Sequence, residues 1–176
     1  MLWNRDPKTG DDITLGAIGG TQALGALTIT AADNVTFNST VAAASLIQSA
    51  GTGTTTFDGA VTTSGAVNLT TAAITNNGAI TAGTTFDTTT SGTIDMNANI
   101  SSSGTITMIG GTGLLDIAAS TTLSSGGNNI NITAGNVELG SGSSINAGVG
   151  GLTFTSANGI ELGSGTSNTF QLNSTE

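Results

Sequence analysis

Apolar residues recur along the chain in short triplets, with a polar residue between two hydrophobic ones. An alternation with a period of two is typical of a strand that buries one face and exposes the other. Three series of such positions follow one another in a fixed order and at a nearly constant interval. This self-similarity predicts a fold made of stacked, repeated units.

The three series share one period of about twenty residues. The first consists of the triplets 27–29, 47–49, 67–69, 86–88, 106–108, 130–132 and 152–154. The second consists of 13–15, 35–37, 55–57, 74–76, 94–96, 115–117, 137–139 and 160–162. The third is a single apolar position per repeat: Ile18, Val41, Val61, Ile80, Ile100, Leu123 and Ile145, with Phe170 or Leu172 as an eighth.

A glycine follows most members of the third series after a few small polar residues. These glycines are Gly65, Gly83, Gly104, Gly126 and Gly148. Glycine reaches positive φ without the steric penalty of a Cβ atom, so we expect tight corners with positive φ at these positions. Each repeat is therefore predicted to contain three short strands and to close with a glycine corner.

A repeat of 19–24 residues with three short strands indicates one coil of a parallel β-helix, whose strands pair with the neighbouring coils at ~4.8 Å. A propeller blade needs a longer repeat, a leucine-rich repeat has a different leucine frame, and a sandwich of hairpins does not require three registers with one period. The sequence predicts an all-β solenoid of about seven coils over residues 13–172, with an N-terminal cap or linker at 1–12 and a tail at 173–176.

The composition supports a folded chain and excludes several kinds of chemistry. Hydrophobic residues make up 36% and the mean hydropathy is +0.20, which is unlike a disordered chain. The absence of Cys and His excludes disulfides, zinc centres of the usual kind and His-based catalytic triads. Arg5 and Lys8 are the two cations, and two are too few to form a nucleic-acid-binding surface. The sequence contains no run of 18 apolar residues, so no insertion into a membrane is predicted.

Residues 129–145 and 151–165 resemble the repeats of filamentous-haemagglutinin-type exoproteins and related autotransporter passengers. The resemblance is one of repeat style and extends over residues 13–172. It implies that the parallel β-helix is right-handed. It also implies an extracellular protein, secreted to the bacterial cell surface, that serves as an adhesin or a spacer shaft.

Acidic residues occupy the outward position of the second series in four successive repeats: Asp95, Asp116, Glu138 and Glu161. Stacked at ~4.8–5 Å, these carboxylates should repel one another, which raises pKa values or recruits a cation. Three interpretations are open: a solvated acidic stripe, a weak Ca²⁺ site that would be the chain's sole cofactor, and a general acid/base pair as in glycoside-cleaving β-helices. The single Trp and the short loops argue against a glycosidase groove, so we expect no enzymatic activity.

Polar residues occupy the outward position of the first series. They are Thr28, Gln48, Asn68, Asp87, Thr107, Asn131 and Thr153. This column is expected to be either a solvated face or a ligand-binding face for ice or carbohydrate, with Thr28, Asn68, Thr107, Asn131 and Thr153 as the binding residues.

The two ends of a β-helix expose strand edges that can pair with other strands. We therefore expect a structural or adhesive rod that stacks end to end with copies of itself, or adjoins further coils of a longer chain. A glycan or host surface is the other expected partner; nucleic acid and a membrane are not expected.

Overall fold

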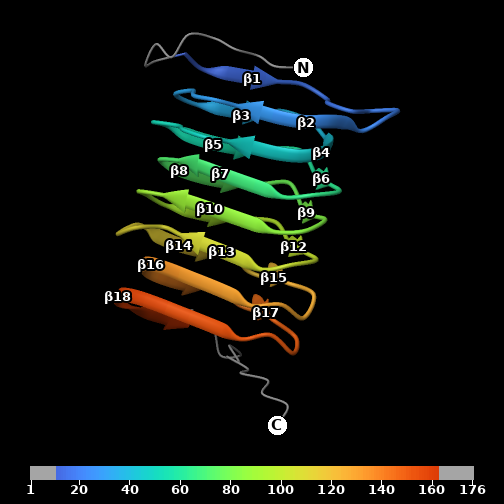
Figure 1. The fold of residues 1–176 in the computed structure, drawn as a ribbon. Helices are drawn as coiled ribbons and strands as arrows, with labels where there is room; N and C mark the ends of the chain where they lie inside the picture. The colour runs from blue at the N-terminus through green and yellow to red at the C-terminus, as the bar shows by residue number, and fades with distance from the viewer. Residues whose placement is uncertain (1–10, 163–176) are drawn as a thin grey trace.

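Three sets of parallel strands build the rod, because each repeat returns the chain to the same three positions one coil further on (Figure 1). The computed structural model describes residues 11–162 and confirms the all-β parallel β-helix, with about seven coils. Asp11 and Asp12 are the described part of the expected cap at 1–12. The remainder of that segment, the tail at 173–176 and the eighth anchor at Phe170 or Leu172 lie outside the described residues.

The first face of the rod carries the first series. Its strands are β2 (Leu24–Ile29), the second half of β4 (Val41–Gln48), β7 (Val67–Thr71), β10 (Phe86–Thr90), β13 (Ile106–Ile109), the first half of β16 (Ile130–Leu139) and the first half of β18 (Leu152–Leu162).

The second face carries the second series. Its strands are β1 (Ile13–Leu15), β3 (Val35–Phe37), β5 (Thr54–Phe57), β8 (Ala73–Asn76), β11 (Ile94–Met96), β14 (Leu114–Ile117) and the second halves of β16 and β18.

The third face carries the third series. Its strands are the first half of β4, β6 (Val61–Thr63), β9 (Ile80–Ala82), β12 (Ile100–Ser102), β15 (Thr122–Ser124) and β17 (Ser144–Asn146), and a single bridge joins Ile18 to Val41 at its start.

The strand registers confirm the second and third series at every described position and correct the first series in one coil. Leu46, rather than Ile47, pairs with Leu27 and with Val67. A shift of one residue exchanges the two faces of a strand, so Ile47 points outward and Gln48 inward. The prediction that Gln48 lies in the outward column is therefore wrong.

The core is a column of apolar side chains that runs the length of the rod between the three faces. Phe37 and Phe57 are fully buried, and their rings stack in parallel with centroids 4.9 Å apart and an interplanar angle of 7°. Farther along the rod, the same column continues through Asn76 and Met96. Each coil closes the core of the next, so stability depends on contacts between neighbouring coils.

The corner glycines are required for two different physical reasons. Gly126 and Gly148 have φ of 61° and 60°, as predicted. Gly65, Gly83 and Gly104 are not among the residues with positive φ, so the predicted reason is wrong for them. A Cβ on Gly83 would lie 2.2 Å from the carbonyl oxygen of Ser64 in the preceding coil, so glycine is needed here for close stacking of backbones.

Candidate functional site

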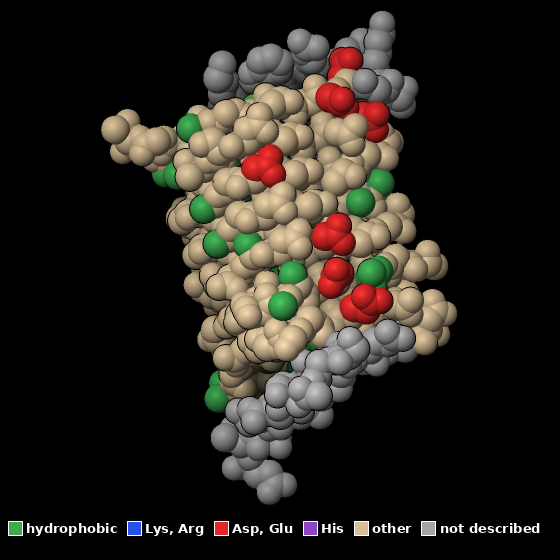
Figure 2. Space-filling view, turned by 180° about the vertical axis from the view of Figure 1, so that it is seen from behind, with side chains coloured by type: hydrophobic (Ala, Val, Ile, Leu, Met, Phe, Trp, Pro, Cys, Tyr) green, Lys and Arg blue, Asp and Glu red, His purple; other side chains and the backbone are tan. Residues whose placement is uncertain are grey.

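The acidic residues of the second face form the predicted column. The register places Asp95 beside Asp116, Asp116 beside Glu138, and the backbone of Glu138 beside that of Glu161. Figure 2 shows acidic side chains following one another down one side of the rod. Asp95 and Asp116 are half-buried, whereas Glu138 is exposed. The predicted stacking of carboxylates is thus present in the strand register.

Burial is the main influence on Asp95, and it raises the pKa of this carboxyl above its ordinary value. The negative charge of Asp116 raises it further, while a hydrogen bond from the Thr75 side chain opposes the shift. Repulsion in the column, which the sequence predicted as a cause of raised pKa values, is therefore the second cause at Asp95 and desolvation the first.

The acidic column does not by itself make a metal centre. Among the side chains that the structure describes, no three carboxylate, imidazole or thiolate groups gather to form a group that could hold a metal ion. A cation in a protein needs several oxygen ligands that converge on one point, and an outward column on a sheet spreads its carboxylates along a line. The calcium hypothesis for Asp95, Asp116, Glu138 and Glu161 stays a prediction.

The polar column of the first face is present but interrupted. Its outward residues, in coil order, are Thr28, Ile47, Asn68, Asp87, Thr107, Asn131 and Thr153. All five residues predicted to bind a ligand lie in this column. Half-buried Ile47 replaces the predicted Gln48 and separates Thr28 from the continuous polar part, which begins at Asn68.

Gln48 lies in a polar cluster inside the rod, and this cluster was not predicted from the sequence. The Thr55 hydroxyl donates to Oε1 of Gln48 at 2.7 Å and lies 3.2 Å from Oγ1 of Thr71. Thr71 in turn donates to the carbonyl oxygen of Gly53 at 2.9 Å. Nε2 of Gln48 is buried without a hydrogen-bond partner, which costs about 1–3 kcal/mol for such a group. A polar residue at the inward position 55 was the available sequence signal for a buried partner.

A second ladder of polar side chains follows the turns between the second and third faces. Nδ2 of Asn77 donates to Oδ1 of Asp58 at 2.9 Å, and Nδ2 of Asn97 donates to Oδ1 of Asn77 at 3.0 Å. The three residues belong to consecutive coils, so each bond ties one coil to the next. These exposed amides contribute to stacking and satisfy one another along the rod axis.

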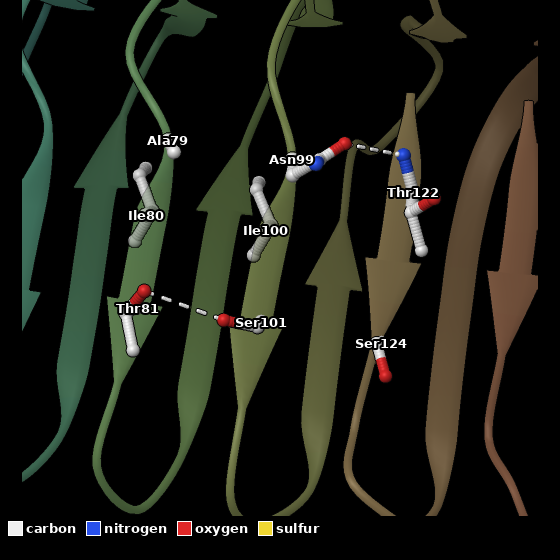
Figure 3. A pocket seen from close by; sticks show the side chains of 8 residues that line it. All are labelled: Ala79, Ile80, Thr81, Asn99, Ile100, Ser101, Thr122 and Ser124. Atoms are coloured by element: carbon white, nitrogen blue, oxygen red, sulfur yellow. Dashed lines mark hydrogen bonds between the residues drawn. The ribbon is translucent and has the colours of Figure 1, made fainter. Parts of the chain in front are cut away.

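The third face contains a shallow depression of about 290 Å³ (Figure 3). The residues that line it are Ala79, Ile80, Thr81, Asn99, Ile100, Ser101, Thr122 and Ser124. Across it, Ser101 donates to Oγ1 of Thr81 at 3.4 Å, and the backbone N–H of Thr122 donates to Oδ1 of Asn99 at 2.8 Å. The residues that line the depression are uncharged, and they lie on a different face from the acidic column.

The third face was not predicted to be a site, although a signal for it is present in the sequence. A small polar residue follows the third-series anchor in five successive repeats, giving the column Thr62, Thr81, Ser101, Ser124 and Asn146. The depression depends in addition on Ala79 and Asn99, whose position relative to this column only the folded coil defines.

These features define the class of the protein as a parallel β-helix of stacked coils, with an acidic column, a polar column and an uncharged third face on its three sides. No family model, curated protein or solved structure matches the chain. Within residues 11–162, the structure contains no helix with the length and apolarity needed to cross a membrane.

Proposed function

We propose that the chain is a non-enzymatic structural rod segment of a secreted bacterial surface or filament-forming protein, and that its coils stack end to end through their strand edges. The observation that carries this proposal is the incomplete burial of the core column toward both limits of the described residues. Leu27 and Leu152 are half-buried, whereas the residues between them in the same column are fully buried: Leu46, Val67, Phe86, Ile106 and Ile130.

The same contrast holds for the other inward positions near the ends. Ile13 and Leu15 on β1, and Ile145 and Phe154 near the opposite end, pack only partly against the core. A further coil laid against either end would complete their burial, and burial of apolar area contributes about 25 cal/mol per Å². Stacking is therefore favoured by the same interaction that holds one coil to the next.

The backbone of β1 supplies the hydrogen-bonding groups for such stacking. The backbone N–H of Ile13 donates to the carbonyl oxygen of Asn34 at 2.8 Å, and the backbone N–H of Asn38 donates to the carbonyl oxygen of Leu15 at 2.9 Å. Both bonds are to the β3 side. Alternate residues of a parallel strand bond to opposite neighbours, so the N–H of Thr14 faces away from β3, toward the side where a further coil would pair.

The experiment that tests stacking is a comparison of Thr14→Pro with Thr14→Ala. Proline removes the outward N–H while its fixed φ is tolerated on an edge strand, and alanine keeps the N–H. We expect the unmodified chain and Thr14→Ala to form filaments or long oligomers in electron microscopy and sedimentation, and Thr14→Pro to form shorter ones. A stable monomer over a wide concentration range for the unmodified chain would contradict self-stacking.

The first face supports a second candidate function, binding of a neutral carbohydrate. Asn68, Asp87, Thr107, Asn131 and Thr153 form an uninterrupted polar column over consecutive coils. Such a column offers hydrogen-bond donors and acceptors at the regular spacing of the coils. Binding of insoluble polysaccharides tests this candidate: Thr107→Lys should weaken retention, and Thr81→Lys on the third face is the matched control.

A further inference from the structure

The segment 46–49 is compatible with two strand registers. In the observed register Leu46 and Gln48 point inward, and Ile47 and Ser49 point outward. A slip of one residue would turn Ile47 and Ser49 inward and Gln48 outward. Each register buries one large aliphatic side chain of the same size, Leu46 or Ile47. Hydrophobic burial at this position therefore does not select between the two registers.

A slip of one residue has to be absorbed by the connection that follows the segment, where Gly51 bridges to Ala32 and the N–H groups of Thr52 and Gly53 donate to the preceding coil. Between β4 and β5 lie Ser49, Ala50, Gly51, Thr52 and Gly53, which are all small and include two glycines. Segments of this composition adopt several backbone conformations at low cost. The strand β5 would keep its position during such a slip, because its register with β3 and β8 is continuous.

The buried polar cluster is present only in the observed register. Thr55 holds Gln48 through its hydroxyl, and Thr71, from the next coil, contacts Thr55 and donates to Gly53. The exposed fractions of Gln48, Thr55 and Thr71 are 1%, 0% and 4%. Gly51 packs closely on the cluster, because a Cβ atom there would lie 2.5 Å from Nε2 of Gln48.

The cluster also carries a disadvantage that the slipped register would remove. Nε2 of Gln48 has no partner inside the rod, and an outward Gln48 would be hydrated. Ile47, half-buried on the surface, would become buried by the same movement, and Leu46, now fully buried, would turn outward in exchange, so apolar burial is unchanged. The hydrogen bond from Thr55 to Gln48 opposes the gain from hydration of the amide.

We propose that the Gln48–Thr55–Thr71 cluster selects the register of segment 46–49, and that loss of the Thr55 hydroxyl shifts the segment to the register with Ile47 inward. The shift changes the first face. In the observed register Ile47 interrupts the polar column, and in the second register Gln48 joins Thr28 to Asn68. The cluster thus determines whether the first face presents one continuous polar column.

Cysteine labelling tests the proposal, because the chain contains no cysteine of its own. Ser49→Cys is a nearly isosteric probe that is exposed in the observed register and inward in the slipped one. We expect Cys at this position to react readily with a water-soluble thiol reagent. Position 55 lies in register with Val35 and Ile74, so valine fits there. Adding Thr55→Val should slow the reaction of the cysteine by about tenfold or more, because the register that exposes it then becomes a minor population.

Three control variants distinguish a cluster that selects the strand register from one that only contributes to stability. Thr55→Ser keeps the hydroxyl and should leave the probe reactive. Gln48→Leu added to Thr55→Val removes the unpaired amide, favours the observed register and should restore reactivity. Thr89→Cys, an exposed position on β10, should react equally in all backgrounds. A Ser49→Cys probe that stays reactive with Thr55→Val, whether the coil holds its register or opens, would overturn the proposal.

Discussion

Phe57 offers the most direct test of the idea that neighbouring coils stabilise one another. Its ring has no exposed surface and stacks on Phe37 of the preceding coil, with the centroids 4.9 Å apart. In the following coil Asn76 occupies the paired position, so no other aromatic ring continues the stack on that side. Phe57→Ala therefore removes one half of an isolated aromatic pair between β3 and β5.

The expected loss of stability follows from the burial of the ring. Phe→Ala substitutions in a close-packed core cost about 3–5 kcal/mol, which includes the cavity left behind. A stacked aromatic pair adds about 0.5–1.5 kcal/mol beyond the buried area. Because the unfolding free energy of a domain is about 5–15 kcal/mol, Phe57→Ala should remove a large part of it.

Urea denaturation followed by circular dichroism measures the effect, with Phe57→Leu and Ile109→Ala as controls. Phe57→Leu keeps most of the volume and should lose less than Phe57→Ala. Ile109 is 40% exposed, and its truncation should cost far less than that of Phe57. A double-mutant cycle with Phe37→Ala should yield a coupling of about 0.5–1.5 kcal/mol. A loss below about 1 kcal/mol for Phe57→Ala would refute the stacked core at this position.

Three further substitutions test the backbone stacking, the acidic column and the buried amide. Gly78→Ala would place a Cβ atom 2.2 Å from the carbonyl oxygen of Gly59, so it should lower stability by about 1–3 kcal/mol, whereas Gly25→Ala meets no atom within 4 Å and should change thermal stability little. Burial and the charge of Asp116 raise the pKa of Asp95, so the folded state holds this proton more tightly than the unfolded chain and gains stability as the pH falls through the raised pKa. Asp95→Asn should raise the urea midpoint at pH 7 and reduce that gain on acidification; an unchanged pH dependence would contradict the assignment. Gln48→Leu should raise the melting temperature, because it removes a buried amide whose Nε2 has no partner, and a lower melting temperature would show that the Thr55 hydrogen bond outweighs that cost.

The fold was predictable because its signal is repeated many times. Most coils place Ile, Val, Leu or Phe at the same inward positions. Single exceptions, such as Thr55 and Asn76, do not alter the period of the hydrophobic pattern. The acidic column was predictable for the same reason, since Asp95, Asp116 and Glu138 occupy equivalent positions in their triplets. Regular strand pairing converts spacing in the chain into neighbourhood in space.

The exceptions were not predictable, because they depend on contacts between residues of different coils. Leu46-Ile47-Gln48 offers an aliphatic residue to either face, so the pattern of hydrophobicity does not choose the register. The choice of inward Gln48 depends on Thr55 and Thr71, which reach it from β5 and from the next coil. Gly83 likewise reads as a turn residue in the sequence, and its actual constraint is the backbone of Ser64 in the coil before it.

The sequence by itself determined the period, the alternation within each triplet and therefore the parallel β-helix with its acidic and polar columns. The tertiary structure alone decided which way segment 46–49 faces, why glycine is needed at each corner, and where the surface is hollowed. The physical reason is that alternation is a property of one strand, whereas register, close approach of backbones and the depression beside Asn99 arise between strands of successive coils.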